Sequence, residues 1–274
     1  MSRDIAAALG TVLIIGGGRM GQTICAGLLQ IDGIVPQSVC VANPGEEKRR
    51  FIEETYGVRT VESCTQGLPA DTIIIAVKPK FVTQVAQELA EEGIPNTRVV
   101  SIAAGISTSS LASVLGNELP IVRVMPNTPL QCGFGMSAIS ASSSASEDDC
   151  ELVRELFSHM GRALIIDEEF QDVACAISGS GPAYFELFCE TIAREGERLG
   201  LDYETALELS LQTMYGTAAL IDTTHQSLPE AIEAVSSPGG TTVAALDAMR
   251  SAGLEEALRC GVRAATRRSK ELGA

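Results

Sequence analysis

Hydrophobic positions divide the chain into two parts with different periodicity. Up to Asp167, short apolar runs rich in β-branched residues alternate with helical patterns, which predicts an α/β domain with a mainly parallel, doubly wound sheet. The predicted strands are 12–15, 38–42, 72–77, 98–103, 121–124, 136–140 and 163–166, with helices such as 81–91 and 147–160 between them. After Asp167 helical periodicity dominates, over 172–177, 183–199, 203–222, 229–235, 242–252 and 254–269. We therefore predict two domains, 1–167 and an all-helical 168–274.

Two helix starts carry a capping box, in which a hydroxyl and an acid three residues later cap each other's backbone. These are Ser146-x-x-Asp149 and Ser227-x-x-Glu230, the second with Pro229 in the first turn. Several helices of the second domain are apolar, for example 203–222, and a small helical domain cannot bury them all. We expect the domain to form a homodimer.

A glycine-rich turn follows the first predicted strand. The strand leads into Gly16-x-Gly18-x-x-Gly21 and then into a helical pattern, the context of a dinucleotide-binding fingerprint. Gly16 would make the tight turn, Gly18 would let the backbone reach a pyrophosphate, and Gly21 would pack the helix on the strand. The motif alone is weak evidence, but its position between strand and helix favours a nucleotide.

The end of the second strand bears on the choice of cofactor. An enzyme that uses NAD usually has an acid there for the ribose 2′-hydroxyl, whereas this chain has Asn43, followed by the basic run Lys48–Arg50. This favours NADPH, with NADH possible. The acids Glu46 and Glu47 weaken the case, and the basic run is also compatible with a solvated helix face.

Prolines and glycines follow three further strands, in Ala76–Pro79, Ser101–Gly105 and Arg123–Pro129. Ligands of doubly wound sheets bind at the carboxyl ends of the strands. Each proline alone could simply end a strand, but three such segments in succession favour a site.

Two elbows of small residues mark the helical domain. Ala234–Thr242 reads AVSSPGGTT and precedes a helix whose N-terminus suits an anion, where Thr241 or Thr242 can cap the helix or donate an O–H. Ser178–Tyr184 reads SGSGPAY, with Pro182 in the first turn of a helix. Together they suggest a substrate pocket, although an ordinary capped helix and close helix packing through glycines are the alternatives.

Composition narrows the possible partners. The net charge of −15 argues against nucleic acid and anionic membranes. The eight cysteines have no metal-like spacing, so we expect reduced core thiols, no metal and a cytoplasmic protein. We see no signal peptide and no apolar run of membrane-spanning length.

The second domain contains no lysine before Lys270, and its one histidine is His225. Reduction of a ketone needs a general acid, and a hydroxyacid-dehydrogenase type of reductase uses a lysine of its second domain for it. A protonated imine already carries its proton and needs mainly orientation and carboxylate binding. The chain therefore suits an imine substrate.

In order along the chain, the segments GGGRMG, AVKP, SIAAGIS, RVMPNTP, SGSGPAY and SSPGGTT closely resemble the pyrroline-5-carboxylate reductase family. The resemblance implies a Rossmann-type N-terminal domain, a helical dimerisation domain and NADPH-dependent reduction of L-1-pyrroline-5-carboxylate to L-proline. It also implies homodimers that often assemble into decamers. A non-catalytic NADPH sensor is the alternative of another class.

Site residues follow from the resemblance by position. Ser236 and Thr242 are the candidate catalytic residues. Substrate contacts are expected from Ser178, Ser236, Gly240, Thr241 and Thr242. The cofactor would be held by Gly16, Gly18, Arg19, Met20, Gly21, Asn43, Ala76, Val77, Lys78, Pro79, Ala103, Ala104 and Gly105. The chain departs from the family at Arg19, Cys64 and Ala234, where asparagine is frequent in other members.

Overall fold

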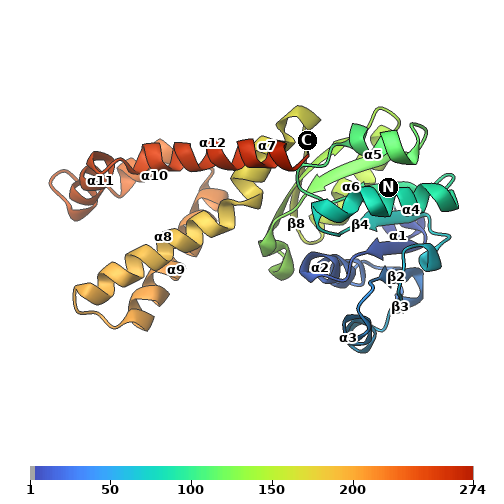
Figure 1. Ribbon diagram of the computed structural model, residues 1–274. Helices are drawn as coiled ribbons and strands as arrows, with labels where there is room; N and C mark the ends of the chain where they lie inside the picture. Colours follow the sequence, from blue (N-terminus) through green and yellow to red (C-terminus); the bar gives the residue numbers. More distant parts are fainter. Residues whose placement is uncertain (1–3, 274) are drawn as a thin grey trace. The chain divides into compact units, whose positions relative to one another are not determined.

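The computed structural model describes residues 4–273, in which eight strands form one sheet of order β3-β2-β1-β4-β5-β6-β7-β8 (Figure 1). The strands are β1 Val12–Ile15, β2 Val39–Ala42, β3 Arg59–Val61, β4 Thr72–Ile75, β5 Arg98–Ser101, β6 Ile121–Met125, β7 Gly135–Ala141 and β8 Gly161–Ile165. β7 runs antiparallel to β6, and the other described pairings are parallel. The predicted doubly wound α/β fold is confirmed.

Helices cover both faces of the sheet because the central strands are apolar on both faces. In β1, Val12 and Ile14 join one core, and Leu13 and Ile15 join the other. The helices are α1 Ile5–Leu9, α2 Arg19–Leu28, α3 Glu46–Tyr56, α4 Val82–Glu92, α5 Thr108–Leu115, α6 Glu147–Ser158 and α7 Gln171–Ala174. The first core includes α2 and α6, and the second includes α4 and α5.

Strand β3 was absent from the predicted strands. It has three residues, Arg59–Val61, none of them buried, and it pairs at the sheet edge with β2. A short polar edge strand has no apolar run to mark it, so its sequence resembles a loop. The structure also ends β4 and β5 two residues earlier than predicted, at Ile75 and Ser101. The residues that follow are therefore loops at the carboxyl edge of the sheet.

The structure divides into two compact units, which are described separately. One runs to Ser180 and includes the chain from Ala265 onward, and the other is Gly181–Ala264. The second unit contains α8 Gly181–Arg198, α9 Tyr203–Thr224, α10 Leu228–Ala234, α11 Thr241–Ser251 and the first part of α12 Leu254–Leu272. The predicted boundary after residue 167 stays a prediction.

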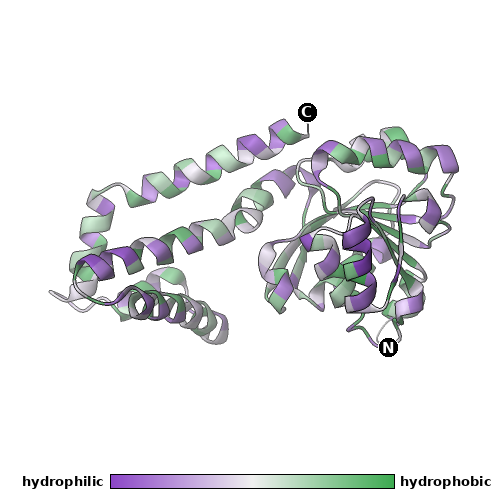
Figure 2. Cartoon of the chain, turned by 60° about the horizontal axis from the view of Figure 1, so that its bottom comes forward, coloured by the Kyte–Doolittle hydropathy of each residue, from purple (hydrophilic) through white to green (hydrophobic). Residues whose placement is uncertain are grey.

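The second unit has little core of its own. Its buried residues are small or polar, namely Gly181, Cys189, Ala193, Ala206 and Ser210. Many large apolar side chains of α8 and α9 are exposed, and Figure 2 shows apolar residues recurring along these helices. Among the described helices, none combines the length and apolar composition that a membrane span requires.

Both predicted capping boxes are confirmed: in each, the serine hydroxyl and its partner acid cap each other's backbone.

Contrary to the prediction from the sequence, the cysteines are not all core thiols. Cys25, Cys40, Cys64, Cys150 and Cys189 are buried, Cys175 is half-buried, and Cys132 and Cys260 are exposed. Burial raises the pKa of Cys25 to about 12, so this thiol stays protonated.

Candidate active site

The glycine loop between β1 and α2 is built by close backbone contacts. Gly16 has φ +114°, and a Cβ there would lie 2.6 Å from the carbonyl oxygen of Ala76. A Cβ on Gly21 would lie 1.9 Å from the carbonyl oxygen of Gly16, so only glycine lets α2 approach the end of β1 this closely.

Gly18 differs from its two neighbours because the protein itself does not require a glycine there. It is the N-cap of α2, its φ is −74°, and no described atom lies within 4 Å of an added Cβ. No side chain among the described residues caps this helix start. The free N–H groups and open space fit an anionic group held against the backbone.

Asn43 connects the end of β2 to the glycine loop. Its side-chain Oδ1 accepts a hydrogen bond from the N–H of Gly17 at 3.2 Å, and its Nδ2 donates to the carbonyl oxygen of Gly45 at 3.3 Å. Arg49 donates from one guanidinium nitrogen to the carbonyl oxygens of Asn43 and Pro44, both at 2.8 Å. Arg49 therefore stabilises the loop after β2, a role that its place in the basic run Lys48–Arg50 did not predict.

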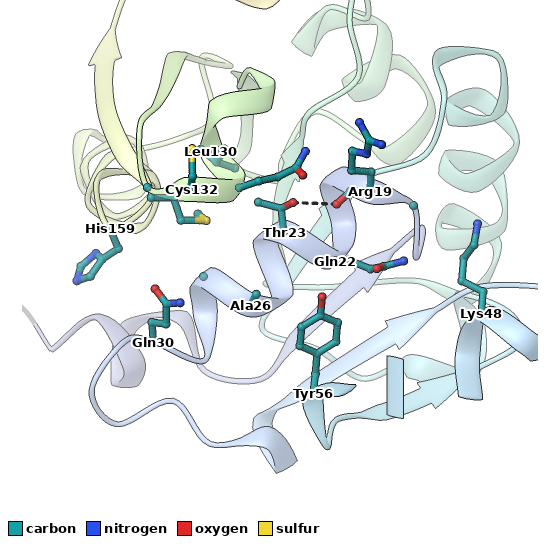
Figure 3. A pocket seen from close by; sticks show the side chains of 15 residues that line it. Arg19, Gln22, Thr23, Ala26, Gln30, Lys48, Tyr56, Leu130, Cys132 and His159 are labelled. Atoms are coloured by element: carbon teal, nitrogen blue, oxygen red, sulfur yellow. Dashed lines mark hydrogen bonds between the residues drawn. The ribbon is translucent and has the colours of Figure 1, made fainter. Parts of the chain in front are cut away.

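An open depression of about 730 Å³ begins at the glycine loop and runs along α2 (Figure 3). Arg19 from α2 and Lys48 from α3 line it together with the amide of Gln22, and its lining includes no carboxylate among the described residues. Gln22 also donates to the carbonyl oxygen of Gly17 at 2.8 Å. In a chain of net charge −15, this is a locally cationic surface beside the free helix N-terminus, suited to phosphate.

The other residues predicted to hold the cofactor lie at the carboxyl edge of the sheet and at the start of α2. The N–H of Ala76 donates to the carbonyl oxygen of Ile15 at 2.8 Å, which holds Ala76 at the edge of the sheet. Lys78 is the exposed N-cap of the short helix Pro79–Phe81. Ala103 is buried in the second core, with Ala104 half-buried beside it. Met20 and Val77 pack their side chains against the two cores.

The elbow at Ser178 is a π-helical turn over Cys175–Gly179. A Cβ on Gly179 would lie 2.6 Å from Cε of Met125, which explains that glycine by packing. Asn127 donates from Nδ2 to the carbonyl oxygen of Ser178 at 3.1 Å and accepts from the N–H of Met136 at 2.8 Å. No pattern in the sequence singles out Asn127 within its motif. The π-turn that it supports is a kind of turn frequent at functional sites.

The segment Ala234–Thr242 lies in the second unit and leads into α11. Gly239 has φ +71°, and Gly240 is the N-cap, with no side-chain cap among the described residues. The expectation that Thr241 or Thr242 caps the helix is therefore wrong, because both lie in its first turn. This supports the prediction that the helix start binds an anion, because no hydroxyl at the N-cap accepts from the N–H groups of the first turn. Ser236 lies nearby in the chain, and its hydroxyl donates to the carbonyl oxygen of Ile232 at 2.6 Å.

Comparison with known proteins agrees with these features. Residues 168–272 match the family model described as pyrroline-5-carboxylate reductase dimerisation, and residues 11–105 match the model described as NADP oxidoreductase coenzyme F420-dependent. The chain is 38% identical to a pyrroline-5-carboxylate reductase of Pseudomonas aeruginosa, over 95% of this chain and 96% of that one.

Solved structures similar to this chain include members of the same family. A pyrroline-5-carboxylate reductase from Coxiella burnetii superposes with a TM-score of 0.89 at 35% identity, covering 97% of this chain and 99% of that one. A pyrroline carboxylate reductase from Plasmodium falciparum, solved with NADP bound, superposes with a TM-score of 0.87 at 27% identity, covering 97% and 98%.

The contrast between Gly18 and Gly21 gives a paired prediction. Gly21→Ala should lower stability by about 1–3 kcal/mol, because its Cβ meets backbone. Gly18→Ala should lower stability by less than about 1 kcal/mol, the ordinary difference between glycine and alanine at an N-cap, and should weaken NADPH binding about tenfold or more, because its Cβ points into the ligand's space. Thermal melts and a fluorescence titration of NADPH measure the two effects. Unchanged NADPH affinity in Gly18→Ala would show that no pyrophosphate approaches this glycine.

Proposed function

The chain belongs to the pyrroline-5-carboxylate reductase family, and from this membership we propose how its own residues share the work of the reaction. It is an oxidoreductase that uses NADPH to reduce L-1-pyrroline-5-carboxylate to L-proline, the last step of proline biosynthesis. The observation that carries the division of roles is a feature shared by the N-termini of α2 and α11. Each has a glycine as N-cap, no side-chain cap among the described residues and no acid in its first turn.

The N-terminus of α2 would hold the pyrophosphate of the cofactor. The helix start has no side-chain cap among the described residues, the space beside Gly18 is open, and Gly16 and Gly21 hold the turn in shape. Asn43 would face the adenosine ribose, with Ala76–Pro79 and Ala103–Gly105 along the remaining length towards the nicotinamide. When bound, NADPH supplies the hydride that reduces the carbon of the C=N bond.

Arg19 and Lys48 would hold the 2′-phosphate that distinguishes NADPH from NADH. Both line the depression beside the glycine loop, whereas the guanidinium of Arg49 is already bonded to two carbonyl oxygens. Within the basic run predicted to favour NADPH, we therefore assign the phosphate contact to Lys48. Arg19 would add a second contact from a different helix.

The N-terminus of α11 would bind the substrate carboxylate through the first-turn N–H groups of Thr241 and Thr242. The hydroxyl of Ser236 would have to rotate away from the carbonyl oxygen of Ile232 to donate to a carboxylate, so its contribution to binding is modest. Thr242 would lie near the imine nitrogen, and Ser178 would contact the substrate from its elbow. No strong acid is needed, because a protonated imine carries its own proton.

The helical unit would form the homodimer, and we extend this to a possible decamer. Large apolar side chains such as Leu187, Leu209 and Leu220 are more than half exposed in the single chain, and exposed apolar surface of this extent is typical of an interface. A cytoplasmic location and the absence of nucleic-acid and membrane partners also belong to this proposal.

Turnover tests the function directly. Purified protein should oxidise NADPH only when pyrroline-5-carboxylate is present, with kcat of at least about 1 s⁻¹. Thr242→Ala should lower kcat, and Ser236→Ala should mainly raise KM for the imine. NADPH binding without turnover would favour a sensor, and wild-type kinetics in both variants would remove Ala234–Thr242 from the site.

Cofactor choice tests the 2′-phosphate assignment. Lys48→Ala should raise KM for NADPH about tenfold and leave KM for NADH unchanged, since it removes a charge-assisted contact to a group that NADH lacks. Arg50→Ala is the matched control, because Arg50 is an exposed neighbour outside the depression. Equal effects of the two substitutions on KM for NADPH would show that Lys48 makes no specific contact with the 2′-phosphate and that the basic run is a solvated helix face.

Dimer formation is tested by loss of the exposed apolar surface. The double substitution Leu209→Ser and Leu220→Ser should shift the protein toward monomer in light scattering coupled to gel filtration. Phe51→Ser, which removes an equally exposed apolar side chain from the α/β unit, should leave the mass unchanged. A dimer that survives the double substitution would place the interface away from these side chains.

A further inference from the structure

The end of α12 lies against the loop that follows β5, within the first unit (Figure 1). Gly105 has φ +80°, and a Cβ there would lie 2.7 Å from the carbonyl oxygen of Ser269 and 3.0 Å from the nitrogen of Gly273. In turn, a Cβ on Gly273 would lie 1.9 Å from the carbonyl oxygen of Gly105. Glycine is therefore required on both sides, and the two backbones are in direct contact.

A partly buried chain of polar contacts holds this arrangement from the other side. The Ser269 hydroxyl, in a residue 3% exposed, donates to Asp172 at 2.6 Å. The guanidinium of Arg123 joins Asp172 at 3.5 Å to Glu168 at 3.4 Å. Glu168 then accepts from the N–H of Thr108 at 2.7 Å and from its hydroxyl at 2.6 Å.

These contacts form a closed ring. Thr108 starts α5, three residues after Gly105, so the ring leaves the loop at Thr108 and returns to it through the end of α12 at Gly105. The side chain of Arg123 is 5% exposed and lies between two carboxylates. Because a buried charge is costly without its partners, this geometry resists loosening at any one point.

We infer that Ser269, with Asp172, Arg123 and Glu168, positions the Ala103–Gly105 loop for the nicotinamide end of the cofactor. The inference rests on the proposed function, which places that loop along the cofactor. Ser269 is a positioning residue: it lies in the ring and acts on the loop through the backbone of α12. In the proposed function the pyrophosphate and the adenosine ribose are held elsewhere, by Gly16–Gly21 and Asn43, so the adenosine half of the cofactor would not depend on the ring.

Ser269→Ala tests the inference because it removes one hydroxyl from the ring and adds no bulk. We expect kcat to fall about tenfold or more, since small misplacements of reacting groups are costly. Amide hydrogen exchange over residues 102–108 should become faster, while the affinity for 2′,5′-ADP, which lacks nicotinamide, should stay at the wild-type value. Lys270→Ala, an exposed neighbour on the same helix, is the matched control and should match wild type in all three.

A second variant disturbs the same contact but keeps all the side chains of the ring. A chain that stops after Lys270 loses Leu272 and Gly273, which lie against Gly105, and should show the same pattern. Wild-type kcat and exchange in both variants would overturn the inference, as would a parallel loss of 2′,5′-ADP affinity, which indicates general unfolding. Absence of turnover in the wild type would refute the proposed reaction, and the exchange data would still decide whether the ring holds the loop.

Discussion

The fit of α2 against the end of β1 is the contact on which the rest of the cofactor half depends. The carbonyl oxygen of Gly16 occupies the space that a side chain on Gly21 would fill, and Gly16 itself lies against the carbonyl of Ala76. These two approaches bring the start of α2 to the carboxyl edge of the sheet between β1 and β4, where the strand order reverses. A helix N-terminus thus faces open space at the crevice in which doubly wound proteins bind ligands.

The acidity of the chain makes the placement of a few positive groups decisive. With a net charge of −15, the protein as a whole repels an anionic cofactor and an anionic substrate. Backbone N–H groups at α2 and α11 provide local positive potential that does not depend on net charge. Among the basic side chains, Arg123 lies in an internal ring and Arg49 bonds to a loop, whereas Arg19 and Lys48 line the depression beside the glycine loop.

The helical unit follows a different physical logic from the α/β unit. Its buried positions are few and small, and its helices expose large apolar side chains. Such a unit gains stability mainly by association, in keeping with the family model for dimerisation that matches residues 168–272. The same unit contains the Gly239–Gly240 turn. Gly239 has φ +71°, a backbone conformation that would be strained in a residue with a side chain.

The sequence by itself determined the two periodicities, the glycine loop, both capping boxes and the motifs of the family, because each is a pattern among residues close in the chain. It did not predict β3, a three-residue strand with a single apolar residue that pairs at the sheet edge with β2. It also could not assign Arg49 to a brace, replace the expected threonine cap of α11 by Gly240, or connect Thr108 to Glu168 and Asp172 to Ser269. Those last pairs lie 60 and 97 residues apart. Only tertiary structure brings such residues within hydrogen-bond distance, and no local pattern records which distant partner a buried polar group will meet.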